Sequence, residues 1–190
     1  MERLSYVHGA MDTPLLGETL GANFDRTVAR WATAGPGGAR RRTLDLCRTG
    51  RAGGAFAAGL LALGLEPGDR VGIWSLNNAE WVVTQIATAK AGLILVNINP
   101  AYRVSELDYA LNKVGVRALI TATAFKTSDY MGMLNTVLPE LADSLPGALQ
   151  AARVPSLRIV IQIGGTAPGT IGFGAVPAYG GPAEHANWPR

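Results

Sequence analysis

The sequence predicts an α/β fold, a doubly wound and mainly parallel sheet. Short runs of branched apolar residues alternate with segments of helical periodicity through most of the middle of the chain. Turn residues separate them: Pro67-Gly68, Gly92 and Gly115 each stand where a helix or a strand is expected to begin or end. The connections are short, and strand–helix–strand units of this kind form parallel pairs with right-handed crossovers.

Four apolar runs are expected to form the strands. Strands covered on both faces read as continuous apolar runs rather than as alternating patterns, so all four are predicted to be buried. They are RVGIWSL (70–76), LILVNIN (93–99), VRALITA (116–122) and LRIVIQI (157–163).

Helices are expected between these strands and before them. Asn77 or Asn78 is placed to cap the helix after the first strand, which Gly92 ends. Ser105 is predicted to cap the next helix, with Asp108 completing a capping-box-like exchange. A further helix fits residues 129–143 and is kinked or ended at Pro139, and an amphipathic one is predicted from the spacing of Leu20, Phe24, Val28 and Trp31.

Composition narrows the class of protein. The 190 residues are 48% hydrophobic and 16% charged, which argues against intrinsic disorder. One cysteine, Cys47, excludes an internal disulfide framework and a multi-cysteine metal site. The arginines clustered at 40–51 lack interleaved aromatic residues, so nucleic-acid binding is not expected. With neither a signal peptide nor a membrane-spanning run, the expected location is cytoplasmic.

The residues alone assemble no active site. Neither G-x-G-x-x-G nor G-x-x-x-x-G-K-[ST] occurs, and the glycine-rich stretch 163–174 holds no lysine, so a surface loop is expected there. His8 and His185 have no metal-ligand partner at a suitable spacing, and Ser75 does not stand in a nucleophile elbow. No catalytic, cofactor-binding or metal-binding residue is predicted; the loops 76–79, 99–104 and 122–128 are where such a sheet would bind a ligand.

Several motifs resemble the N-terminal subdomain of adenylate-forming enzymes, and more narrowly the AMP-dependent medium- and long-chain fatty acyl-CoA synthetases. The most specific are GDRVGIWSLNNAEW (68–81), ATAKAGLILVNINPAYR (87–103), SELDYALNKVGVR (105–117) and TAFKTSDY (123–130). Segments 5–31 and 139–165 also fit that group. The likeness covers most of the chain.

The resemblance implies a ligase that works in two steps. A fatty acid and ATP give acyl-adenylate and pyrophosphate with the help of Mg²⁺, and coenzyme A then displaces AMP. The phosphate loop, the adenine-binding segment and the catalytic lysine of that family have no counterpart in this sequence, so the chain is expected to be inactive alone. Lys90, in the family motif ATAKAG, is expected to have a structural role.

One stretch departs from the family pattern. Residues 32–54 stand where the family has a basic and aromatic strand. The later part of this stretch, residues 40–54, has the sequence RRRTLDLCRTGRAGG. Back-translation of 44–54 with a shift of one nucleotide permits Trp followed by T-Y-A-E-L-D-A-R-V. The hypothesis is that about 43–54 is out-of-frame text, which would leave Leu60 and Leu63 poorly covered; the alternative is ordinary divergence in a loop.

The expected organisation is therefore a partial adenylation subdomain over 1–165, with 32–54 suspect, and a loose tail over 166–190. An open sheet edge would favour poor solubility or association with another chain. Two other interpretations stay open: a non-catalytic binding or interaction module, and an unstable product of a frameshifted gene.

Overall fold

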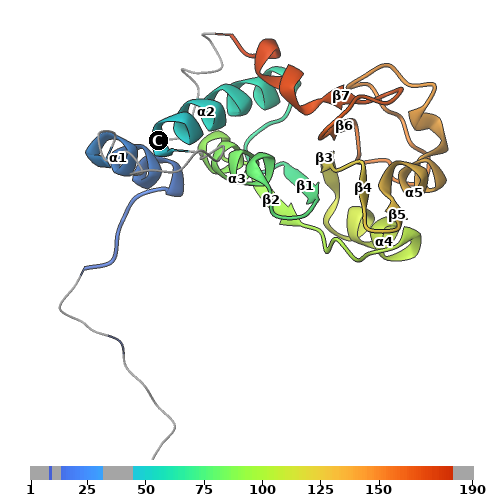
Figure 1. Ribbon diagram of the computed structural model, residues 1–190, viewed down its shortest axis with the longest axis horizontal. Coiled ribbons are helices and arrows are strands. Elements are labelled where there is room, and N and C mark those ends of the chain that lie inside the picture. The colour runs from blue at the N-terminus through green and yellow to red at the C-terminus, as the bar shows by residue number, and fades with distance from the viewer. Residues whose placement is uncertain (1–8, 10–13, 32–44, 182–190) are drawn as a thin grey trace, which may run out of the picture.

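The computed structural model describes residues 9, 14–31 and 45–181 of the chain (Figure 1). Its larger elements are α1 (Leu20–Trp31), α2 (Leu46–Ala62), β1 (Arg70–Trp74), α3 (Ala79–Ala91), β2 (Ile94–Asn97), α4 (Val104–Val114), β3 (Val116–Thr121), α5 (Tyr130–Val137), β6 (Ile159–Gln162) and β7 (Ile171–Gly172). Smaller ones are the hairpin strands β4 (Ala124–Phe125) and β5 (Ser128–Asp129), and the 3₁₀ helices η1 (Pro139–Leu141) and η2 (Phe173–Tyr179).

The main sheet has five strands in the order β2-β1-β3-β6-β7, and every pair in it is parallel. Helices α2 and α3, with η2, cover one face of this sheet, and α4 and α5 cover the other. Alternate residues of each strand point to opposite faces, so Ile73 packs under α2 and α3 while Trp74 packs against α4 and α5. The predicted doubly wound α/β fold is confirmed.

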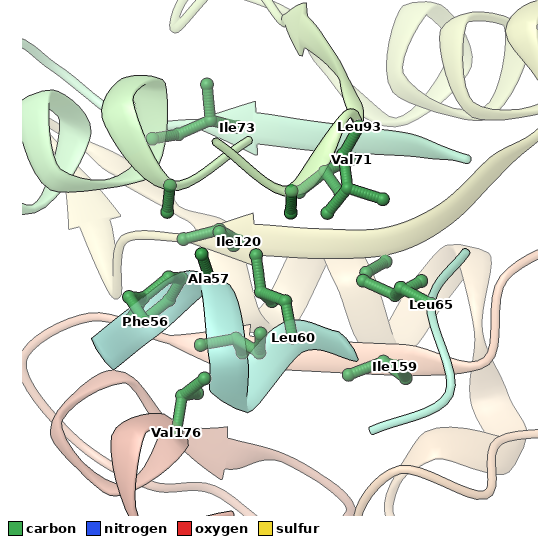
Figure 2. Close-up of a cluster of buried hydrophobic side chains, with 14 of the residues drawn as sticks. Phe56, Ala57, Leu60, Leu65, Val71, Ile73, Leu93, Ile120, Ile159 and Val176 are labelled. Atoms are coloured by element: carbon green, nitrogen blue, oxygen red, sulfur yellow. The ribbon is translucent and has the colours of Figure 1, made fainter. Parts of the chain in front are cut away.

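The core beneath α2 is closely packed. Figure 2 shows Phe56, Ala57 and Leu60 of α2 facing Ile120 of β3 and Ile159 of β6. Leu60 is fully buried, a burial that stabilises by about 1.5–3 kcal/mol. The expectation that Leu60 and Leu63 are poorly covered was wrong for Leu60, and Leu63 is partly buried against the same cluster.

Several helix boundaries follow the sequence prediction. The periodic residues between 20 and 31 form α1, and Asn78 is the N-cap of α3. Gly92 ends α3 in the left-handed conformation, with φ of 70°. α5 ends before Pro139, which then begins η1, because proline lacks the N–H that would continue the helix.

Replacing Asn78 by alanine is expected to destabilise the chain by about 1 kcal/mol, because the Asn78 Oδ1 accepts a hydrogen bond from the Trp81 N–H at 2.8 Å. The midpoint of urea unfolding measures the loss. Asn77→Ala is the matched control, since Asn77 is exposed and precedes the cap. An equal loss in both variants would contradict the assignment of the cap.

The second strand is less buried than predicted. β2 is at the edge of the sheet, and its Ile94 is 50% exposed. An apolar run does not reveal whether a strand has a neighbour on both sides, and here β1 is the only neighbour of β2 among the described residues. The flanking Leu93 and Ile98 are buried.

The start of α4 also differs from the prediction. Arg103, not Ser105, is the N-cap residue, and the Arg103 N–H donates to Glu106 Oε2 at 3.1 Å. Glu106 is therefore the acid that completes the cap. Asp108 instead forms an ion pair with Arg153, at 2.8 Å.

The predicted loose tail is wrong for residues 166–181. Ile171 pairs with Ile161 in the sheet, and Phe173 stacks on Phe56 with ring centroids 4.2 Å apart. Val176 of η2 is fully buried against α2. Apolar side chains spaced along an irregular segment thus find partners that local periodicity does not show.

Some predictions lie outside the described residues: those on His8 and His185, the arginines at 40–42, the part of the tail at 182–190 and the suspect segment at 32–44. The later part of the suspect segment is described. Residues 46–54 form the first turns of α2, and the Asp45 Oδ1 caps them by accepting from the Arg48 N–H. None of the helices in the described ranges is long and apolar enough to cross a membrane.

Candidate functional site

The candidate site is the carboxyl edge of the sheet, where the loops after β1, β2, β3 and β6 come together. Parallel strands present their carboxyl ends on one edge, and ligands of open α/β sheets bind there. The structure connects three of these loops by hydrogen bonds. The arrangement is built from the residues that end each strand and from Tyr130, the first residue of α5.

Two aromatic side chains anchor the loop after β2. The Trp74 and Tyr130 rings stack with centroids 3.7 Å apart and an interplanar angle of 6°. The Trp74 Nε1–H donates to the Asn99 carbonyl at 3.1 Å, and the Tyr130 hydroxyl donates to the Pro100 carbonyl at 2.5 Å. Both side chains are fully buried.

The loop after β3 joins this arrangement through the same tyrosine. The Tyr130 N–H donates to the Thr123 carbonyl at 3.2 Å. The Thr123 hydroxyl in turn donates to the carbonyl of Ile163, which follows β6, at 3.1 Å. Hydrogen bonds therefore run across the carboxyl edge from the loop after β2 to the loop after β6.

The glycine-rich stretch 163–174 is ordered by side chains from the sheet. The Gln162 Oε1 accepts from the Ala167 N–H at 2.6 Å and from the Thr170 hydroxyl at 3.3 Å. Gly169 has φ of 74°, and a Cβ there would lie 1.8 Å from the Leu141 carbonyl oxygen. The predicted surface loop is therefore found only in part, because β7 (Ile171–Gly172) and the start of η2 lie within the stretch and Ile171 is buried. Gly169 is required for close packing against Leu141.

The remaining predicted loop, 76–79, forms the entrance to α3. The Ser75 hydroxyl accepts from the Asn78 Nδ2 at 2.9 Å and donates to the Leu76 carbonyl at 3.0 Å. Ser75 is buried and hydrogen-bonded within the turn. It supports the N-cap residue of α3 through its hydrogen bond from Asn78.

An apolar hollow of about 430 Å³ lies beside the carboxyl end of β2. Val96, Asn97 and Ile98 form one wall, and α4 forms another with Tyr109 and Val114 among its residues. Tyr102, from the loop that Trp74 and Tyr130 anchor, also lines it. Glu106 is at its rim; the backbone N–H groups of Glu106 and Arg103 lower the pKa of that carboxyl, which is therefore ionised at neutral pH.

A metal or phosphate site would need clustered acidic side chains or lysines. No group of three or more His, Cys, Asp or Glu side chains that could hold a metal occurs within 9, 14–31 and 45–181. Lys126 is exposed on the β4–β5 turn, its Nζ 5.2 Å from the Phe125 ring centroid. The Lys90 Nζ is buried in an ion pair with Asp25 of α1, at 2.5 Å, which fits the structural role expected for this lysine.

Glu140 gives the chain a pH-dependent contact. The Ala152 N–H donates to Glu140 Oε1 at 3.0 Å, and this bond lowers the pKa of the carboxyl below its ordinary value of 4.5. A carboxyl with a lowered folded-state pKa stabilises the fold above its ordinary pKa. That contribution is lost as the pH falls through the lowered value.

Glu140→Gln is therefore expected to destabilise the chain at about pH 7 and to matter progressively less as the pH falls to about 3. Urea unfolding of the variant and the parent at a series of pH values measures this difference. A deficit that stays constant over the whole series would show that the charge of Glu140 has no part in the contact.

Comparisons with known proteins agree with the fold and the motifs. Residues 49–181 match the family described as AMP-binding enzyme. That match extends over more than half of the chain, and the chain belongs to this family. It is 39% identical to the mitochondrial medium-chain acyl-CoA ligase ACSF2 of Rattus norvegicus, in an alignment of 190 positions that covers 96% of this chain and 30% of the relative. The chain thus spans about a third of that relative's length.

Two solved structures show the same architecture. A long-chain-fatty-acid-CoA ligase from Archaeoglobus fulgidus superposes with a TM-score of 0.67 at 18% identity, over 94% of this chain and 33% of that one. The N-terminal subdomain of NpsA from Klebsiella oxytoca, solved with 3-hydroxybenzoyl-AMSN, gives 0.56 at 18% identity, over 90% and 34%. At these identities the likeness concerns the fold alone.

The sequence pointed to the loops of the carboxyl edge but missed the residues that organise them. Trp74 was assigned to a buried strand and Tyr130 to a helix face, and no local pattern pairs them. The NINPAY segment at 97–102 indicated a turn after the strand, since Pro100 cannot continue it, but gave no sign of which side chains hold that turn.

Proposed function

We propose that this chain is the sheet-forming N-terminal part of a fatty acid–CoA ligase and is inactive in adenylation by itself. The reaction of the complete enzyme joins a fatty carboxylate to the α-phosphorus of ATP and releases pyrophosphate. The thiol of coenzyme A then attacks the acyl carbon and releases AMP. The observation that carries the proposal is 39% identity across 96% of the chain to a medium-chain acyl-CoA ligase.

The described residues do not fit the cations and phosphates that this chemistry needs. Transfer to ATP requires Mg²⁺ and donors placed around the phosphate oxygens. The hydroxyl and amide groups of Ser75, Thr123 and Gln162 are already engaged in hydrogen bonds within the edge. We therefore derive no catalytic step from these residues and assign them the support of the loops.

A chimeric enzyme tests the proposal. Residues 1–190 replace the matching segment of the rat ligase, and ATP–pyrophosphate exchange is measured with fatty acids of several chain lengths. Exchange that depends on the fatty acid and on Mg²⁺ is expected. A chimera that melts cooperatively but supports no exchange with any acid would contradict the proposal.

A second chimera addresses the suspect segment. It keeps the relative's own residues in place of 32–54 and is otherwise identical. The family match begins at residue 49, inside the stretch 43–54 for which a frameshift is predicted, and the frameshift stays a prediction. If it is real, the second chimera is expected to be the more stable and more active of the two; resequencing the coding DNA decides directly, and an unbroken frame would end the idea.

The isolated chain is further proposed to associate through the β2 edge. Ile94 is 50% exposed there, and an open edge strand pairs readily with another chain. Ile94→Lys is expected to shift sedimentation toward the monomer, because a charged edge residue opposes pairing. Val82→Lys is the control, on a 40%-exposed position of α3; a parent chain that is already a monodisperse monomer would contradict association.

A cytoplasmic location stays part of the proposal. The rat relative is named as mitochondrial, so the location of this chain is open to direct measurement with a tagged protein. The other two interpretations, an interaction module and an unstable gene product, are distinguished by the same chimeras. Inactivity of both folded chimeras favours the interaction module, and degradation of the isolated chain favours the unstable gene product.

A further inference from the structure

Trp74 and Tyr130 are core residues that also donate hydrogen bonds through their side chains. Both side chains are fully buried, and their rings stack almost parallel at 3.7 Å. Phenylalanines could also stack in this core, and at position 130 a phenylalanine would keep the same ring. Each of the two residues has in addition one polar hydrogen, and a buried donor without a partner is costly.

Both hydrogens are directed at the same turn. The Trp74 indole donates to the Asn99 carbonyl and the Tyr130 hydroxyl to the next carbonyl, that of Pro100. The turn also holds itself: the Ala101 N–H donates to Asn99 Oδ1 at 2.9 Å, and the Tyr102 N–H donates to the Asn99 carbonyl at 3.0 Å. The backbone of 99–102 is therefore fixed from the core side by two side chains and locally by Asn99.

We infer that Trp74 and Tyr130 are positioning residues, which act through the turn 99–102 to hold Tyr102 against the apolar hollow beside β2. The proposed function enters this inference at one point only, namely that the complete ligase uses the carboxyl edge of the sheet. The positioning itself is a property of this chain. Without the two hydrogen bonds the turn would keep its own contacts but lose its attachment to β1 and α5.

Tyr130 also couples the turn to the neighbouring loop. Its N–H donates to the Thr123 carbonyl after β3 while its hydroxyl donates to Pro100 after β2. One residue at the start of α5 thus sets the spacing of two carboxyl-edge loops. Burial raises the pKa of the Tyr130 hydroxyl, so the group remains a protonated donor throughout the neutral range.

Amide hydrogen exchange of the 190-residue chain tests the inference. Tyr130→Phe keeps the ring and the stack and removes only the donor. The Ala101 and Tyr102 amides are expected to exchange about tenfold faster, the scale set by one buried hydrogen bond. Amides of β3, such as Leu119 and Ile120, are expected to keep their rates once the change in global stability is subtracted.

Two further variants make the result specific. Trp74→Phe removes the second donor and is expected to accelerate the same amides. Tyr109→Phe is the matched control, because Tyr109 also lines the hollow but is 66% exposed; it is expected to change none of them. The Trp74 indole N–H resonance supplies a spectroscopic signature, and it should shift in Tyr130→Phe and stay in Tyr109→Phe.

Acceleration spread evenly over the sheet, or none at 101 and 102, would overturn the inference and leave the two aromatics as ordinary core residues. Because these rates are read without any enzymatic assay, they stand apart from the proposed function. If the chimeric ligase is active, Tyr130→Phe in the chimera is expected to change KM or kcat. Tyr109→Phe in the chimera is the control, and it is expected to keep the kinetic constants and the melting temperature of the parent chimera. If the chimera is inactive, the exchange pattern still decides the positioning role.

Discussion

Replacing Gly59 by alanine is expected to destabilise the chain by about 3 kcal/mol or more. A Cβ at this position of α2 would lie 2.1 Å from the Val176 carbonyl oxygen and 2.7 Å from its carbon. Backbone atoms cannot rotate away from the added Cβ as the end of a flexible side chain can. The 3₁₀ helix η2 would therefore have to move away from α2. The fully buried Val176 would then become exposed.

Gly50→Ala is the matched control for this change. It is in the same helix, and the nearest atom to its Cβ, the Val28 Cγ2, is at an ordinary 3.4 Å. Alanine is a better helix former than glycine, so this variant is expected to be neutral or more stable by up to about 1 kcal/mol. Both are compared by urea unfolding, with limited proteolysis after residue 165 as a second readout. Equal stability of the two variants would mean that η2 does not pack on α2 as described.

The second large effect is expected for Trp74→Ala, about 3–5 kcal/mol, the range for removing a large buried aromatic side chain. Trp74 is the last residue of β1 and is fully buried. Its ring stacks on Tyr130, and its indole N–H donates to the Asn99 carbonyl. The variant therefore leaves a cavity and an unstacked Tyr130 ring, and it removes one of the two hydrogen bonds to the Asn99 carbonyl. The free energy of unfolding in urea measures the total.

Trp31→Ala serves as the comparison for Trp74→Ala. Trp31 ends α1 and is 50% exposed, so its removal is expected to cost less than about 1 kcal/mol. Trp74→Phe should fall between the two, because it keeps an aromatic ring at the site but loses one hydrogen bond and part of the buried volume. A loss at position 74 no larger than at position 31 would refute the account of the core on this face.

The sequence predicted much of the fold because its local patterns are consistent with one another. The apolar runs around Ile73, Leu119 and Val160 became the central strands, and Gly92 and Pro139 ended helices where they were expected to. These features depend on neighbouring residues alone. Short segments of a single sequence are therefore sufficient to predict them.

The parts that were missed depend on residues far apart in the chain. The exposure of Ile94 follows from the order of the strands, which periodicity does not contain. The docking of η2 depends on Gly59 and on the stack of Phe56 with Phe173. At the carboxyl edge the loops were predicted from topology, but the pairing of their anchoring side chains was not, because stacking of two distant aromatics leaves no signal in either segment.

The chain has the fold of an AMP-binding enzyme, and we propose that it carries out no adenylation alone. ATP–pyrophosphate exchange by the purified 190-residue chain, with a panel of fatty acids, tests it most directly. We expect no exchange above the level of a no-enzyme control, at a protein concentration at which the rat ligase is readily detected. Robust exchange that requires both a fatty acid and Mg²⁺ would contradict the claim, because an adenylating site would then exist within these residues.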